Sequence, residues 1–216
     1  SSARIPKSGL YVSGDKHILD NEARLLAAYQ ADGYLDDRGR CRFHFRKERK
    51  VKRLVDLAGE GGTTCYDNSD GTVTIQLHTK LPTYEKEAGA YLLDWCQSSL
   101  SAFIDELKYW DGNRSGTVQC RVSTVKPNHA EWLQTIAHLV GKASQRNIIR
   151  EAQPERNKQT LYGVSVNNRT CARLSSMKYV HRTRSPEKVF CPQTSTGYFM
   201  FRRNGKIGIT GNCNYG

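Results

Sequence analysis

The chain has 216 residues, which is enough for one large or two small domains, and its formal net charge is +12 at pH 7. No stretch approaches the roughly 20 apolar residues of a membrane span, so we expect no membrane partner. The seven cysteines are odd in number and lack paired spacing, which argues against a disulfide framework and a zinc site. The excess of cations instead predicts a polyanionic partner.

Residues 1–20 are predicted to form a basic, loop-like segment ahead of the first helix. That helix contains Leu25 to Gly33, which reads Leu-Leu-Ala-Ala-Tyr-Gln-Ala-Asp-Gly and ends in Asp32-Gly33. A carboxylate in this position faces the negative end of the helix dipole, so it is unfavourable unless a cation lies nearby. The small residues Ala27, Ala28 and Ala31 would let a second helix approach closely.

Two strands with alternating apolar and polar residues are predicted after this helix. The polar faces carry Arg40, Arg42, His44 and Arg46 in the first strand, and Thr72, Thr74, Gln76 and His78 in the second. Between them, a helix through Val51 and Leu57 ends at Gly59 to Gly62, and a hairpin turns at Asn68 to Gly71. A further helical stretch is predicted from Tyr84 to Gln97.

A second helix-forming run, Ile104 to Gly112, also ends in Asp-Gly, at Asp111-Gly112. Two such ends predict a duplicated unit that brings Asp32 and Asp111 side by side, although two ordinary helix ends would give the same pattern. The strand that follows, Thr117 to Ser123, directs Gln119 and Arg121 to one face. A helix over residues 128–142 and strands near 146–150 and 161–166 complete the unit.

The outward positions of these strands hold cations, amides and hydroxyls, and no acid. A sheet face of this composition suits the reading of base edges in a DNA groove. A solvated outer face is the commoner fate of such strands, but it explains the polarity without explaining the bias toward cations and amides.

The chain resembles a LAGLIDADG homing endonuclease of the intein-borne kind over residues 21–212. The motif at Ala27 to Gly33 is a close variant, whereas the second places Lys108, Tyr109 and Trp110 where small residues are usual. The resemblance implies an α+β class and a duplicated αββαββα fold, with two units related by a pseudo-two-fold axis. It also implies saddle-shaped sheets over the major groove of double-stranded DNA, and a monomeric protein.

The resemblance also implies the chemistry. Asp32 and Asp111, with Gly33 and Gly112, would hold Mg²⁺ or Mn²⁺ and make a double-strand break. The family has basic residues around its metals, and Lys126 matches that segment in the second unit. In the first unit the equivalent is Lys47, with Lys50 as its rival. A plain phosphate contact is the alternative role for each lysine.

The C-terminal residues, with short alternating strands around Asn204-Gly205, predict a hairpin. The same stretch resembles the C-terminal splicing blocks of an intein (Hint) domain, in which Asn212 would cyclise and Cys213 would accept the upstream acyl chain. Gly211 stands where histidine commonly assists. Cys191 and Thr210 match branching positions of some inteins, and a core role for Cys191 is the alternative.

The N-terminal splicing blocks are missing, so the chain resembles the C-terminal part of a split or truncated phage-type intein that needs an N-terminal partner. In chain order, we expect an N-terminal segment 1–20, repeats 21–97 and 98–176, a Hint segment 177–212 and flanking residues 213–216. We expect a site-specific endonuclease for the intein insertion site. The alternatives are a descendant with an inactive nuclease that only binds nucleic acid, or a splicing fragment carrying such a domain. We expect an intracellular location, in the cytoplasm of a prokaryotic or phage-infected cell, and no secretion.

Overall fold

The computed structural model describes residues 4–6, 13–110, 113–115, 118–167, 171–173, 192–195 and 197–211. For residues 4–6, 113–115, 118–119 and 171–173 it describes the backbone alone. No helix in these ranges combines the length and the apolar character that crossing a membrane requires.

Two consecutive stretches of the chain have the same order of helices and strands. The first unit comprises α1 (Asp20–Asp32), β2 (Gly33–Leu35), β3 (Cys41–Phe45), α2 (Glu48–Ala58), β4 (Thr63–Asp67) and β5 (Val73–Leu77). The second unit comprises α3 (Gln97–Glu106), β6 (Asn113–Ser115), β7 (Val118–Thr124), α4 (Pro127–Leu139), β8 (Ala143–Arg150) and β9 (Leu161–Asn167).

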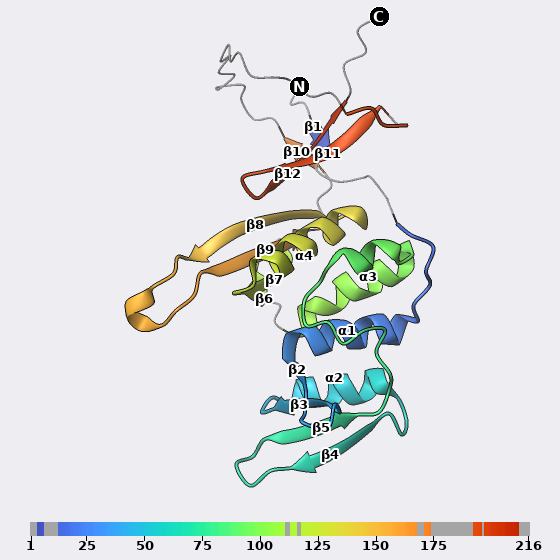
Figure 1. Cartoon of the computed structure of the whole chain (residues 1–216), viewed down its shortest axis with the longest axis vertical. Coiled ribbons are helices and arrows are strands. Elements are labelled where there is room, and N and C mark those ends of the chain that lie inside the picture. The colour runs from blue at the N-terminus through green and yellow to red at the C-terminus, as the bar shows by residue number, and fades with distance from the viewer. Residues whose placement is uncertain are drawn as a thin grey trace, which may run out of the picture.

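Each unit forms an antiparallel sheet, and the fold is therefore mixed α and β. The first sheet has the order β2-β3-β5-β4, and the second contains the matching order β6-β7-β9-β8. Helices α1 and α3 pack side by side between the two sheets, with α2 against the first sheet and α4 against the second (Figure 1).

The apolar faces predicted for the strands are confirmed. Cys41, Phe43 and Phe45 of β3 are buried beneath α1 and α2, and Cys120 and Val122 of β7 are buried beneath α4. Full burial of a large apolar side chain stabilises a fold by about 1.5–3 kcal/mol, so the alternation decides which face turns inward. In α1, Ala27 and Ala28 are fully buried, consistent with the expected close approach of a second helix.

A buried carboxylate joins the units at this helix seam. Glu106, the last residue of α3, is fully buried and accepts hydrogen bonds from Arg53 Nε at 2.8 Å and Arg24 Nη1 at 3.2 Å. Arg53 Nη2 and Trp110 Nε1 donate two more, at 2.5 Å and 3.1 Å. Arg24 comes from α1 and Arg53 from α2, so one side chain of the second unit ties two helices of the first.

The predicted helix over Tyr84–Gln97 is wrong. This segment holds only a short 3-10 helix, η1 (Ala90–Asp94), because tertiary hydrogen bonds satisfy its backbone. Tyr29 Oη donates to the Tyr84 carbonyl, and the Ala88 amide donates to His129 Nδ1. Gly89, extended at φ −157° and ψ −175°, interrupts the stretch.

Two other expectations need correction. The second motif helix is α-helical only to Glu106 and continues as a 3-10 turn, η2 (Leu107–Tyr109). The N-terminal segment is not wholly a loop, since β1 (Arg4–Pro6) pairs with β10 (Cys171–Arg173).

The predicted C-terminal hairpin is present as β11 (Tyr198–Arg203) and β12 (Lys206–Gly211). Asn204 and Gly205 both have positive φ, as a tight two-residue hairpin turn requires. The hairpin does not stand apart, because β12 pairs with β8 and extends the second sheet to six strands (Figure 1).

Candidate nucleic-acid interface

The first predicted acid lies at the C-terminal end of α1. The Asp32 side chain is 23% exposed, and Lys50 Nζ donates to Asp32 Oδ2 at 2.5 Å. Lys50 comes from the first turn of α2, and its own side chain is only 10% exposed. The ammonium offsets the unfavourable position of a carboxylate at the negative end of a helix, as the sequence requires.

A second lysine neutralises the same helix end. Lys86 Nζ donates to the carbonyls of Tyr29 and Gly33, each at 2.5 Å, and lies 4.8 Å from the centroid of the Tyr29 ring. Gly33 has no room for a side chain, because a Cβ there would lie 2.5 Å from Tyr29 Cδ2. Sequence analysis missed Lys86, because it lies in the segment that was wrongly predicted as a helix.

The structure brings Lys50, not Lys47, to Asp32. Lys47 is exposed at the N-cap of α2, with φ −91° and ψ 112°. Lys126 holds the same position at the N-cap of α4, with φ −95° and ψ 109°, and its Nζ lies 3.1 Å from Glu87 Oε1. A sequence signal for Lys50 existed, since Lys50 and Leu54 are one turn apart on the same face of α2 and both are buried.

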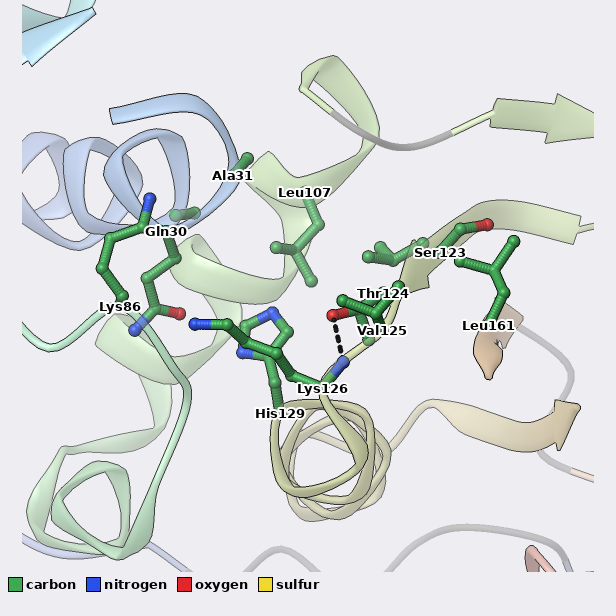
Figure 2. Close-up of a pocket in the computed structure, with 12 residues that line it drawn as sticks. Gln30, Ala31, Lys86, Leu107, Ser123, Thr124, Val125, Lys126, His129 and Leu161 are labelled. Carbon is green, nitrogen blue, oxygen red and sulfur yellow. Dashed lines mark hydrogen bonds between the residues drawn. The ribbon is translucent and has the colours of Figure 1, made fainter. Parts of the chain in front are cut away.

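A cavity of about 380 Å³ lies between α1 and the N-terminal end of α4, with Lys126 and His129 at its centre (Figure 2). His129 Nδ1 accepts the Ala88 amide proton at 2.8 Å, which leaves its proton on Nε2. Burial lowers the pKa of His129 to about 4, the ammonium groups of Lys126 and Lys86 act in the same direction, and Glu87 opposes them. The imidazole is therefore neutral at pH 7.

The cavity also contains a buried hydrogen-bond acceptor without a partner among the described residues, on Gln30. Gln30 Nε2 donates to Tyr91 Oη at 2.7 Å and to the Glu85 carbonyl at 3.0 Å, while Gln30 Oε1 is buried with no partner among the described residues. Figure 2 shows the Gln30 side chain directed toward Lys126 and His129. The cavity thus combines an acceptor with a neutral donor and a nearby cation.

The second predicted acid, Asp111, and Gly112 lie outside the described residues. Within the described part of the chain, no three histidine, cysteine, aspartate or glutamate side chains gather as a metal cluster. Asp32 Oδ1 has no hydrogen-bond partner there, and a carboxylate oxygen is the ligand type that Mg²⁺ prefers. Asp32 therefore fits as one ligand, and a metal at this end of α1 would need further oxygen ligands.

The first sheet presents the predicted polar face. Register places Arg42 opposite Gln76 and His44 opposite Thr74, so these four side chains share one surface. His44 Nδ1 and Thr74 Oγ1 are hydrogen-bonded at 3.2 Å. His78 is exposed after β5, and Arg46 is exposed after β3.

An acidic side chain orders the arginines of this face. Asp36 Oδ2 lies 2.8 Å from Nε of both Arg40 and Arg42, and Asp36 Oδ1 accepts the backbone amide protons of Arg38 and Arg40. Partial burial acts in the opposite direction, but the hydrogen bonds from Arg40 and Arg38 keep the pKa of Asp36 below its usual value.

The prediction that Thr72 is available for DNA contact at this face is wrong. Its side chain is buried, with Oγ1 donating to Asp70 Oδ1 at 2.5 Å and accepting from Asn68 Nδ2 at 3.0 Å. Asn68 Nδ2 also donates to Thr74 Oγ1 at 3.0 Å, so Thr72 lies on the same side as Thr74 and is covered there by the residues of the turn.

Three exposed residues of the same face escaped the sequence analysis. Tyr34 of β2 lies opposite Arg42, Thr64 of β4 lies opposite Gln76, and Tyr66 of β4 lies opposite Thr74. Tyr34 and Tyr66 are 43% and 47% exposed. Their strands were not assigned faces, because the sequence alone does not show which strands are neighbours.

The second sheet has a comparable face. Arg121 is exposed and its Nε donates to Ser165 Oγ at 3.3 Å, and Gln145 of β8 follows on the other side of Ser165. Gln145 and Asn147 are exposed and were not predicted as part of this face. The backbone of Gln119 belongs to β7, but its side chain is outside the described atoms.

The splicing candidates fall mostly beyond the described residues. Thr210 and Gly211 end β12, with Thr210 half-buried and Gly211 exposed. Cys191, Asn212 and Cys213 lie outside the described ranges, so their predicted roles stay predictions.

No protein-family model matches the chain, and no curated protein sequence matches it. Among solved structures, the chain resembles the homing endonuclease I-DmoI in complex with DNA and Ca, at TM-score 0.45 and 14% identity over 68% of this chain and 83% of that chain. I-DmoI in complex with DNA and Mn matches at TM-score 0.44 and 14% identity, over 68% and 89% of the two chains. The N-terminal LAGLIDADG domain of DUF199/WhiA matches at 0.45 and 14%, over 66% and 74%.

Proposed function

We propose that the chain is a DNA endonuclease of the LAGLIDADG kind that cuts both strands of an asymmetric duplex site. The observation that favours this function most is the position of Asp32. This carboxylate ends a central helix, at the seam between two sheets that each present a face of cations, amides and hydroxyls. The net charge of +12 favours association with a polyanion at the same surfaces.

The proposed arrangement treats the two units as repeats related by a pseudo-two-fold axis, acting together in a monomer. Their shared sheet order supports this proposal. The outward faces of β3 and β5 would read one half of the site, and those of β7, β8 and β9 the other half. Because the two faces differ in sequence, the target need not be palindromic.

Each group near the seam has a proposed part in phosphodiester hydrolysis. Asp32 and Asp111 would hold Mg²⁺ or Mn²⁺, with Gly33 and Gly112 beside them. When bound, the metal supplies an activated water and neutralises charge on the phosphate. Lys50 orients the Asp32 carboxylate, and Lys47 and Lys126, at matching N-caps, contact phosphate oxygens.

The test is cleavage of a plasmid library that carries randomised inserts, in the presence of Mg²⁺. We expect the wild-type protein to cut a defined sequence and Asp32→Asn to lose at least about 10²-fold in rate, because one charged metal ligand is lost. Asp37→Asn removes a nearby carboxylate from an exposed turn and is the matched control. Binding without cleavage in the wild type would favour the alternative, a nuclease-inactive DNA-binding protein.

A second proposed function is protein splicing with an N-terminal intein fragment. The observation that favours it is sequence order, since β12 ends at Gly211 directly before Asn212-Cys213. The proposed Hint segment spans 177–212, after repeats 21–97 and 98–176, in an intracellular protein. Mixing the chain with a candidate N-terminal fragment should yield ligated product, and Asn212→Ala should abolish it. Absence of product with intact Asn212 would contradict this function.

A further inference from the structure

The C-terminal hairpin continues the outward polar face of the second sheet. Register places Arg121 opposite Ser165, Ser165 opposite Gln145, Gln145 opposite Lys206, and Lys206 opposite Arg203. Residues directly opposite each other on neighbouring strands project to the same side of a sheet. One row of side chains therefore runs from β7 across β9, β8 and β12 to β11.

The two basic residues of the hairpin on this row are available to a ligand. Arg203 and Lys206 are exposed, and neither side chain has an ion-pair or hydrogen-bond partner within the described ranges. Arg202, the residue before Arg203 in β11, projects to the opposite side of the sheet. There its Nη2 donates to Glu131 Oε2 of α4 at 2.8 Å. The hairpin therefore has one cation paired with Glu131 on its inner face and two exposed cations on its outward face.

The hairpin tip is held against the body of the second unit. Gln134 Nε2 of α4 donates to the Gly205 carbonyl at 2.7 Å, and the Arg146 amide donates to the same oxygen at 3.1 Å. Met200 packs against the core. A fixed tip presents its cations without the entropic cost of ordering a mobile loop.

The same outward face also carries an exposed aromatic ring. Phe201 is 45% exposed and lies over Gly208, where a Cβ would approach the Phe201 ring to 2.6 Å. An apolar ring beside two exposed cations is a surface composition that suits the sugar and phosphate of a nucleic acid.

We propose that the β11–β12 hairpin is an extension of the DNA-binding surface, in which Arg203 and Lys206 contact backbone phosphates beyond the reach of β8. This inference rests on the proposed DNA-binding function. Two added strands at about 4.8 Å spacing lengthen the face by about 10 Å, or roughly three base-pair steps of 3.4 Å. The first sheet ends at four strands, so the footprint extends further on the flank held by the second unit.

The experiment measures how DNA affinity depends on salt, with the full chain and the target duplex selected from the library. Arg203→Gln combined with Lys206→Gln should reduce the slope of log K against log [salt] by about 2, because each phosphate contact contributes close to one counterion. The DNA segment that the protein protects from nuclease digestion should also become shorter, at one end only. Arg202→Gln removes the same charge from the neighbouring residue on the opposite face and should keep the wild-type slope.

Each outcome separates this inference from the function on which it rests. If the wild-type protein binds DNA and the double variant keeps its slope and footprint, the hairpin extension is overturned and the endonuclease proposal stands. If the wild-type protein does not bind DNA, both fall. Arg203→Lys combined with Lys206→Arg preserves both charges and should keep the wild-type slope. A slope as low as that of the double glutamine variant would overturn the proposed phosphate contacts.

Discussion

The two units share a scaffold and differ in charge at matching positions. Lys47 and Lys126 are both helix N-caps, and three residues later stand Lys50 and His129. Lys50 is paired with Asp32, whereas His129 is buried, neutral and bonded to a backbone amide. The same strand order therefore supports two different local electrostatic environments at matching helix ends.

The largest expected effect comes from breaking the join between the units. Glu106→Gln leaves Arg24 and Arg53 without their buried carboxylate, and removal of one partner from a buried pair costs about 3–5 kcal/mol of stability. Denaturant unfolding of the variant beside Asp37→Asn, at an acid in an exposed turn of the first unit, measures this cost. Equal stability of the two variants would show that the seam does not depend on Glu106.

The neutral histidine of the second unit should make stability depend on pH. The pKa of His129 is about 4 when folded, against about 6.5 for an unperturbed histidine, so the unfolded chain binds the proton first. The stabilisation is fully present above pH 6.5 and is lost as pH falls toward 4, by about 3 kcal/mol. His129→Asn can still accept the Ala88 amide proton but does not titrate, so the part of the pH slope due to this residue should vanish. An unchanged slope would contradict the neutral assignment.

The polar face of the first sheet should distinguish target DNA from unrelated DNA less well when Arg40 and Arg42 no longer pair with Asp36. Asp36→Asn keeps an oxygen for the backbone amides of the turn but removes the charge that holds Arg40 and Arg42. We expect the ratio of target to unrelated DNA affinity to fall roughly 5- to 10-fold, as when one bidentate base contact is lost. Asp37→Asn, at the adjacent exposed residue, controls for the change in net charge, and an equal fall in both variants would show that only net charge matters.

The smallest expected effects come from substitution of two threonines, Thr74 in β5 and Thr72 in the turn before it. Thr74→Ala removes an outward hydroxyl and should weaken DNA binding by about 1 kcal/mol or less. Its effect on unfolding should be smaller, because Asn68 Nδ2 keeps Thr72 Oγ1 as an acceptor. Thr72→Ala should instead destabilise the hairpin by a similar amount and leave DNA affinity unchanged. A binding titration and a thermal melt measure these effects. Loss of DNA affinity in Thr72→Ala, without loss of stability, would show that Thr72 contacts DNA.

The sequence predicted those features that depend on local alternation and turn chemistry. The apolar faces of β3 and β7, the end of α1 at Asp32 and the turn at Asn204-Gly205 follow from residue spacing, and the structure has each of them. Tyr84 to Gln97 was wrongly predicted as helix, because its backbone partners come from α1 and α4 rather than from its own sequence. Lys86 was missed for the same reason, and Lys50 was predicted only as the rival of Lys47, because tertiary packing brings the cation to a helix end.

Cleavage sequencing of the randomised plasmid library tests the central claim most directly. Wild-type protein with Mg²⁺ should enrich cut molecules for one asymmetric sequence, and Asp32→Asn, shown by circular dichroism to remain folded, should enrich none. A folded wild-type protein that cuts no sequence, or an Asp32→Asn variant that cuts as the wild type does, would contradict this claim.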